Sequence, residues 1–123
     1  MSSLDYLFDG VRERFPTLAS LADGEHKRLR FDVEPSSLWF ESLSKAINLE
    51  MAGGVPAEVY APFFSFLDAA LESCCDEVRD CIDSSFVENL FWQVQSATQI
   101  RAYWDQMPSS LKALYVAFHG QEP

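Results

Sequence analysis

Carboxylates are the residues of this chain whose spacing most readily suggests chemistry. Five of them recur at intervals of three or four residues: Asp68, Glu72, Asp76, Asp80 and Asp83. On helices, such spacing places side chains along one surface ridge. A carboxylate pair can supply the general acid and base of a hydrolase, but one member then needs a pKa raised by burial. Each of these acids falls on the polar side of its predicted helix, so we predict no catalytic residue among them.

Cysteine and histidine offer a second kind of chemistry. Cys74, Cys75 and Cys81, with His26 or His119, could supply a nucleophile or zinc ligands. Cysteines on an apolar helical face are typical of small core residues, and thiolate activation needs electropositive surroundings that these acidic helices lack. The cysteine spacing also differs from that of zinc sites, and the chain contains no H-E-x-x-H, C-x-x-C, G-x-S-x-G or glycine-rich phosphate loop. We therefore expect no enzyme activity, no metal and no cofactor.

Negative charge is concentrated in one segment. Residues 68–88 carry a net charge of −6, more than half of the −10 of the whole chain. The acidic residues of this segment are Asp68, Glu72, Asp76, Glu77, Asp80, Asp83 and Glu88. A concentrated anionic surface accelerates association with a basic protein and opposes binding to nucleic acid or anionic lipid. A solvated face that keeps a small domain soluble explains the same pattern.

Aromatic residues occur as adjacent pairs. The pairs are Trp39–Phe40, Phe63–Phe64, Phe91–Trp92 and Tyr103–Trp104. Neighbours on one helix cannot both face the same core, so we expect one member of each pair near the surface or between helices. Exposed tryptophans are favoured anchors in protein interfaces. We therefore add Trp92 and Trp104 to the seven acidic residues as candidate partner-binding residues.

Helices must position these residues, because apolar side chains recur with helical spacing through most of the chain. The predicted helices cover about 4–15, 37–52, 57–75, 76–90, 94–106 and 109–118. We expect the third and fourth of these to form one hairpin and the last two another. Residues 17–35 are predicted to contain a turn at Asp23–Gly24 and an extended stretch at 28–34. The predicted fold is all-α, a compact antiparallel bundle of five to seven helices, with stacked helical-hairpin repeats as the alternative.

Length and composition set the remaining bounds. The 123 residues suit a single helical domain, 1–123, and the 48% of hydrophobic residues suffice for a packed core. The amino terminus carries acids where a signal peptide has basic residues, and no apolar run approaches the roughly 18 residues of a membrane span. An odd number of cysteines is typical of a reducing compartment. We expect a cytoplasmic protein that does not bind membranes.

Three segments resemble a known group of proteins. They are the phenylalanine-rich stretch 63–73, the segment 76–90, which begins Asp-Glu-Val-Arg and ends Phe-Val-Glu-Asn-Leu, and the segment 107–115. Over residues 57–118 the chain resembles the small, acidic, mostly helical immunity proteins of bacterial polymorphic and type VI secreted toxin systems. The resemblance implies a protein that binds its cognate toxin and neutralises it. It supplies neither catalytic residues nor the identity of the toxin.

We therefore predict an immunity, or antitoxin-like, protein whose partner is a cognate protein toxin. The acidic surface favours a basic toxin, such as an enzyme that acts on nucleic acid. The protein itself is expected to be a monomer or a weak homodimer. The alternative is a small helical adaptor or oligomerising scaffold without catalysis.

Overall fold

The computed structural model describes residues 3–72 and 75–123, and all regular structure within these ranges is helical. Within these ranges, seven α-helices and two helical segments of other types follow one another: α1 (Ser3–Arg14), α2 (Pro16–Arg28), α3 (Ser37–Ala52), η1 (Ala57–Tyr60), α4 (Ala61–Glu72), α5 (Asp76–Asp80), η2 (Cys81–Val87), α6 (Ala97–Gln106) and α7 (Ser109–His119). Segment η1 is a 3-10 turn, and η2 is π-helical. The predicted all-α class is confirmed.

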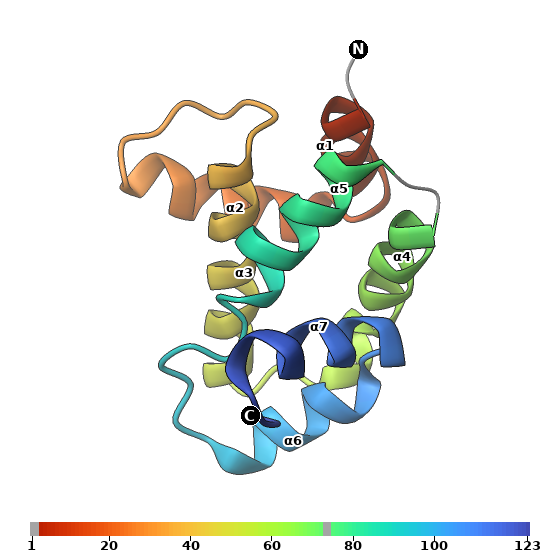
Figure 1. The fold of residues 1–123 in the computed structure, drawn as a ribbon. Coiled ribbons are helices and arrows are strands. Elements are labelled where there is room, and N and C mark those ends of the chain that lie inside the picture. Colours follow the sequence, from red (N-terminus) through yellow and green to blue (C-terminus); the bar gives the residue numbers. More distant parts are fainter. Residues whose placement is uncertain (1–2, 73–74) are drawn as a thin grey trace.

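Helix α3 is the central element of the fold. It contacts α2, η2 and α6, and Figure 1 shows α2 crossing its upper part while η2 lies beside it. The helix begins where the Ser36 side chain accepts a hydrogen bond from the Trp39 backbone amide, as an N-cap serine typically does. Nine of its residues are buried, more than one amphipathic stripe can provide. The sequence of α3 therefore serves packing on more than one side.

The aromatic core explains how adjacent aromatic residues are accommodated. Trp39 and Phe40 are both fully buried, as are Phe63 and Phe64. The Trp39 ring meets Phe8 of α1 edge to face, with ring centres 4.7 Å apart. One member of each pair thus lies between helices, which is one of the two places expected. Among the four adjacent aromatic pairs, all of which lie in the described residues, only Phe91–Trp92 has an exposed ring, that of Trp92.

The sequence predictions for two regions of the backbone are wrong. Asp23–Gly24 forms no turn, because Pro16 begins α2 and the helix continues to Arg28. The stretch predicted to be extended, 28–34, begins with that last helical residue and a turn at 29–30. Helix 76–90 is also not continuous. Its α-helical part ends at Asp80, π-helical η2 follows, and residues 88–93 form turns. Because Ser44 of α3 donates a hydrogen bond to the Phe86 carbonyl at 2.8 Å, the end of η2 is held by α3 instead of by a further helical turn.

None of the described helices is long and apolar enough to cross a membrane.

Candidate functional site

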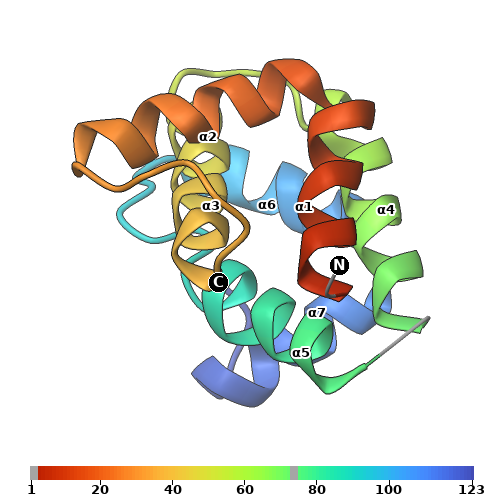
Figure 2. The same cartoon turned by 90° about the horizontal axis from the view of Figure 1, so that it is seen from above.

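A groove runs along one side of α3. It has a volume of about 350 Å³, and two loops, residues 29–36 and 88–96, form its walls. In Figures 1 and 2 the loop 88–96 lies to the left of α3, and the loop 29–36 begins on that side before it crosses to the start of α3. The lining side chains are Leu29, Phe31, Leu38, Glu41, Ser42, Lys45, Asn48, Leu49, Ala52, Asn89, Trp92, Gln93 and Val94. We call this feature the Trp92 groove, because Trp92 is its most exposed large side chain.

Exposed apolar side chains gather in the Trp92 groove. Five of the large hydrophobic residues that the fold leaves exposed line it: Leu29, Phe31, Leu38, Leu49 and Trp92. Single exposed apolar residues are normal on a protein surface, but a contiguous set marks an interaction site. The groove is therefore the leading candidate for a binding surface.

The Asn48 side chain helps to hold the wall that carries Trp92. Asn48 donates a hydrogen bond to the Asn89 carbonyl at 2.9 Å and accepts one from the buried Phe91 amide at 2.7 Å. Phe91 and Gln93 have positive φ angles of 70° and 60°, so this loop adopts a conformation that L-residues rarely take. The Asn48 hydrogen bonds stabilise that conformation.

The loop turns neighbouring aromatic rings in opposite directions. The Phe91 ring packs inward against Tyr115 of α7 and Trp104 of α6, at centre distances of 5.6 and 6.3 Å. Trp92 points outward, and 68% of its surface is exposed. Phe91 thus anchors the loop in the core, and Trp92 is free to contact a partner.

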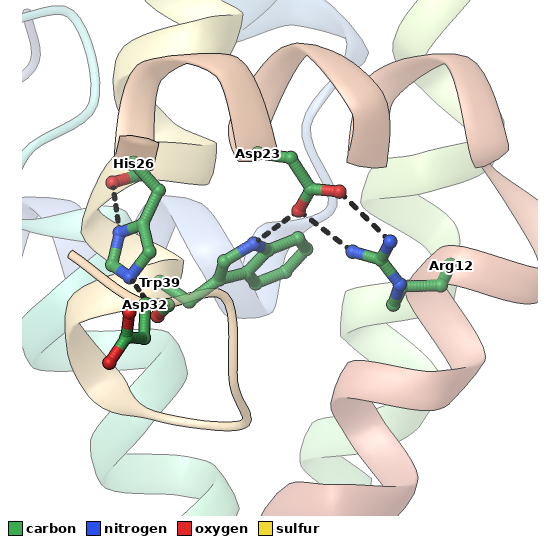
Figure 3. Close-up of polar contacts among 6 residues, drawn as sticks. Arg12, Asp23, His26, Asp32 and Trp39 are labelled. Atoms are coloured by element: carbon green, nitrogen blue, oxygen red, sulfur yellow. Dashed lines mark hydrogen bonds and ion pairs between the residues drawn. The ribbon is translucent and has the colours of Figure 1, made fainter. Parts of the chain in front are cut away.

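His26 fastens the opposite wall. This buried residue of α2 places Nδ1 2.8 Å from the Ser42 hydroxyl of α3 and Nε2 3.0 Å from the Asp32 carbonyl of the loop (Figure 3). The Phe31 ring lies over the imidazole, with ring centres 5.2 Å apart. Both nitrogens of the imidazole are used for structure, and Phe31 is held at the edge of the groove.

An ion pair behind this wall joins three helices. Arg12 of α1 donates two hydrogen bonds to Asp23 of α2, at 2.8 and 2.9 Å, and the Trp39 indole of α3 donates a third at 2.9 Å (Figure 3). Burial raises the pKa of Asp23, but the hydrogen bonds from Arg12 and Trp39 outweigh burial and leave its pKa below the usual value. The network fixes α2, and with it the His26 wall, against α3.

The predicted acidic residues do not all form one surface. Glu72 ends α4, and Asp76, Glu77 and Asp80 lie on α5, which packs against both α4 and α1. These four are exposed, and we call them the acidic corner. Within the described ranges, no Lys or Arg forms a salt bridge with them. Glu77 also has a structural role, because it accepts a hydrogen bond from the Leu4 amide at 3.0 Å and so caps the start of α1.

The other three predicted acids are less available. Asp68 is half-buried and accepts a hydrogen bond from the Ser110 hydroxyl of α7, so the prediction of a free surface charge there is wrong. Asp83 and Glu88 are half-buried because η2 turns toward α3 and α7. The acidic surface is therefore smaller than the sequence spacing suggested.

Trp104 also has to be removed from the candidate set. Only 4% of it is exposed, because its ring packs against Phe91 and Tyr115 in the core. Lys112 covers the ring, with its amine 5.6 Å from the ring centre. The expectation that Trp104 reaches the surface is wrong, and Trp92 remains as the aromatic candidate.

Cysteine and histidine do not assemble a site within the described residues. Cys81 is buried, and burial raises the pKa of its thiol to about 12. Cys75 is exposed at the start of α5, and Cys74 lies outside the described residues. In residues 3–72 and 75–123 no group of three His, Cys, Asp or Glu side chains could hold a metal ion.

Sequence reasoning missed most of the groove. The sequence predicts only an extended stretch around Leu29 and Phe31, and Asn48 belongs to no recognisable motif. One signal was present in the sequence: Leu38 and Leu49 lie outside the apolar stripe Phe40, Leu43, Ile47 and Met51 of α3. Two large apolar residues off the core-facing stripe of a helix can indicate a second apolar face.

The comparisons with known proteins give one match. The model of a protein family described as "Domain of unknown function (DUF7674)" matches residues 8–120. No curated protein and no solved structure matches the chain.

Proposed function

For this chain, which belongs to the DUF7674 family, we propose an immunity-type function: it binds a cognate protein toxin in the cytoplasm and neutralises it without catalysis. The observation that carries the proposal is Trp92. Its ring is exposed beside a groove of other apolar side chains, and Asn48 holds the backbone of the loop on either side of position 90, at Asn89 and Phe91. Trp is the residue type most enriched among those that dominate binding energy in protein interfaces.

Preorganisation supports a binding role. A partner that docks in the Trp92 groove meets loops already fixed by Asn48 and His26, so little conformational entropy is lost on association. A stoichiometric inhibitor depends on tight binding, and such rigidity favours tight binding.

The acidic corner supports a basic partner. Its exposed carboxylates are not neutralised by described basic residues, and the whole chain carries a charge of −10. Such a field raises the rate at which a basic protein associates and repels nucleic acid. Asp83 and Glu88, which are half-buried, add to the same negative field.

Co-expression tests the proposal. The protein should rescue cells from the toxin encoded beside its own gene, and the two proteins should co-purify. Trp92→Ala should weaken rescue, whereas Phe118→Ala, which truncates an exposed aromatic residue outside the groove, should not. If soluble, folded wild-type protein fails to rescue the cells, the immunity function is refuted.

The acidic corner can be tested separately. Asp76→Lys with Asp80→Lys should slow association with the toxin at low salt, and the difference from wild type should shrink at high salt. Both residues are exposed and make no described salt bridge, so the fold should be retained. An unchanged association rate at low salt would show that the corner only keeps the protein soluble.

A second candidate is an adaptor or oligomerising scaffold, which the same exposed apolar side chains favour. Light scattering distinguishes the two. A stable homo-oligomer that forms without another protein, and that Trp92→Ala dissociates, would support the scaffold and count against the toxin inhibitor.

A further inference from the structure

One face of α3 forms the floor of the Trp92 groove. Leu38, Glu41, Lys45 and Leu49 line it from α3, at intervals of three or four residues. The distance from Leu38 to Leu49 corresponds to roughly 16 Å of helix at 1.5 Å per residue. Three turns of a second helix have about the same length, and an amphipathic helix that binds in a groove presents apolar residues at the same intervals.

Three uncharged polar side chains of the groove, Ser42, Asn48 and Asn89, are already bonded within the protein. Ser42 is bonded to His26, both ends of the Asn48 amide are used, and the Asn89 amide donates to the Ser85 carbonyl at 2.8 Å. A ligand that relied on hydrogen bonds would find few partners here. An apolar ligand would bury the exposed rings and leucines without leaving these groups unpaired.

Charge selects among apolar ligands. Lys45 lies 3.8 Å from Glu25, which also pairs with Arg28. Glu41, by contrast, is exposed, and no described residue forms a salt bridge with it. Of the two charged side chains that line the groove, Lys45 and Glu41, only Glu41 is without a described salt bridge. A second copy of this chain, itself carrying −10, would meet like charge on docking, whereas a basic ligand would be attracted.

We propose that the Trp92 groove binds a basic amphipathic helix of the partner protein, about three turns long, which lies along α3 with a Lys or Arg beside Glu41. This inference rests on the proposed function in that it assigns the partner-binding surface. It adds the secondary structure, length and charge of the segment that is recognised.

Synthetic peptides test the inference without the toxin. The probe is a capped peptide of about four turns with Leu on one face at helical spacing and Lys on both flanks. One control peptide carries Glu in place of Lys, and another has the same composition in an order that forms no apolar face. Trp39 and Trp104 are buried, so Trp92 dominates any change in tryptophan emission on binding. The Lys peptide should shift that emission to shorter wavelength, and both controls should bind at least tenfold more weakly.

Variants separate groove binding from attraction to an acidic protein. Trp92→Ala, followed by peptide anisotropy, should weaken binding by roughly thirtyfold or more, as expected when a hot-spot tryptophan is truncated. Phe118→Ala is the matched control. Glu41→Lys should weaken binding of the Lys peptide by about tenfold, whereas Asp80→Lys, an equal charge change on the acidic corner, should change it less than twofold. Equal effects of Glu41→Lys and Asp80→Lys would overturn the inference, as would equal binding of the Glu peptide.

Two other occupants would give distinct results. If the groove is a contact between copies, wild-type protein should dimerise and the Lys peptide should not compete. If it takes an extended segment, the scrambled peptide should bind as well as the helical one. Either result overturns the inference and leaves the rescue test of toxin neutralisation untouched. Peptide binding without rescue would instead support the groove as a helix-binding site and refute the immunity function.

Discussion

Removing the side chain of Asn48 should destabilise the protein and release Trp92. In Asn48→Ala, the buried Phe91 amide loses its acceptor at 2.7 Å. The part-buried Asn89 carbonyl loses its donor at 2.9 Å and keeps only the Trp92 amide, at 3.4 Å. An orphaned buried amide costs about 1–3 kcal/mol, and the carbonyl can be rehydrated for about 0.5–1 kcal/mol. The free energy of unfolding should therefore fall by about 2–3 kcal/mol.

Gln99 provides a matched control for that prediction. Its side-chain amide also bonds twice to backbone, to the carbonyls of Met51 and Val55, both at 3.1 Å. Truncation in Gln99→Ala orphans no buried amide, and the Val55 carbonyl still accepts a hydrogen bond from Tyr103 at 2.7 Å. This variant should lose only about 0.5–1 kcal/mol.

Urea unfolding followed by circular dichroism measures both variants. With a slope of about 1–3 kcal/mol per M, Asn48→Ala should lower the midpoint by roughly 1–2 M, and Gln99→Ala by less than half of that. Asn48→Ala should also weaken binding of the Lys peptide, because the Trp92 loop is no longer fixed. Equal losses of stability in the two variants would refute the reasoning that the Phe91 amide dominates the cost.

Three further predictions follow from burial and backbone geometry. The pKa of Asp23 is lower in the folded state than its value of about 3.9 in the unfolded state, so the charged carboxylate stabilises the fold at pH values above about 4. Asp23→Asn should therefore lower the free energy of unfolding by about 1 kcal/mol at pH 7. Urea titrations should show the difference in stability between wild type and variant disappearing as the pH falls below about 4. A stability difference between wild type and Asp23→Asn that does not change with pH would contradict this prediction. Cys81 should resist iodoacetamide at pH 8 in the native state and react in urea, as peptide mass mapping would show; rapid native labelling would contradict its burial. A methyl group added at Gly24 or Gly120 would meet open space, but of these two glycines only Gly120 has a positive φ. Gly24→Ala should therefore stabilise the fold by about 1 kcal/mol, and Gly120→Ala should destabilise it by about the same amount. Thermal melting measures both changes. Shifts of the same sign would count against the backbone argument.

The helical class was predictable because large apolar residues recur at helical intervals in most elements. Helix α2 was not, since its inward face consists of Leu18, Ala19, Ala22 and His26. Two alanines and a histidine give little hydrophobic contrast against Gly24, whose turn propensity was overridden by packing on α3.

The candidate site was less predictable, because its geometry depends on contacts between residues far apart in the chain. Asn48 and Phe91 are separated by 43 positions, and nothing in the local sequence marks them as partners. The π-helical η2 also changes the direction in which later side chains point. A pattern of 3.6 residues per turn continued from 76 to 90 therefore does not give the orientation of Trp92. Trp104 lies on the regular helix α6 and is buried together with its neighbour Tyr103, which a single helical stripe does not predict. The acidic corner was predicted better, because exposed charge on helix ends depends mainly on local sequence.

The opposite orientation of Phe91 and Trp92 separates two evolutionary pressures at adjacent positions. Loop geometry depends on the Phe91 ring and on the backbone atoms that Asn48 holds, so the spacing from Asn89 to Phe91 is constrained. The side chain at position 92 contributes little to the folded core and can be replaced without loss of stability. An insertion within this loop would instead disturb both the packing of Phe91 and the orientation of the side chain at position 92. Relatives that bind different partners can therefore diverge at position 92 and at the exposed leucines of α3 while they keep the loop length and the asparagine that fixes it.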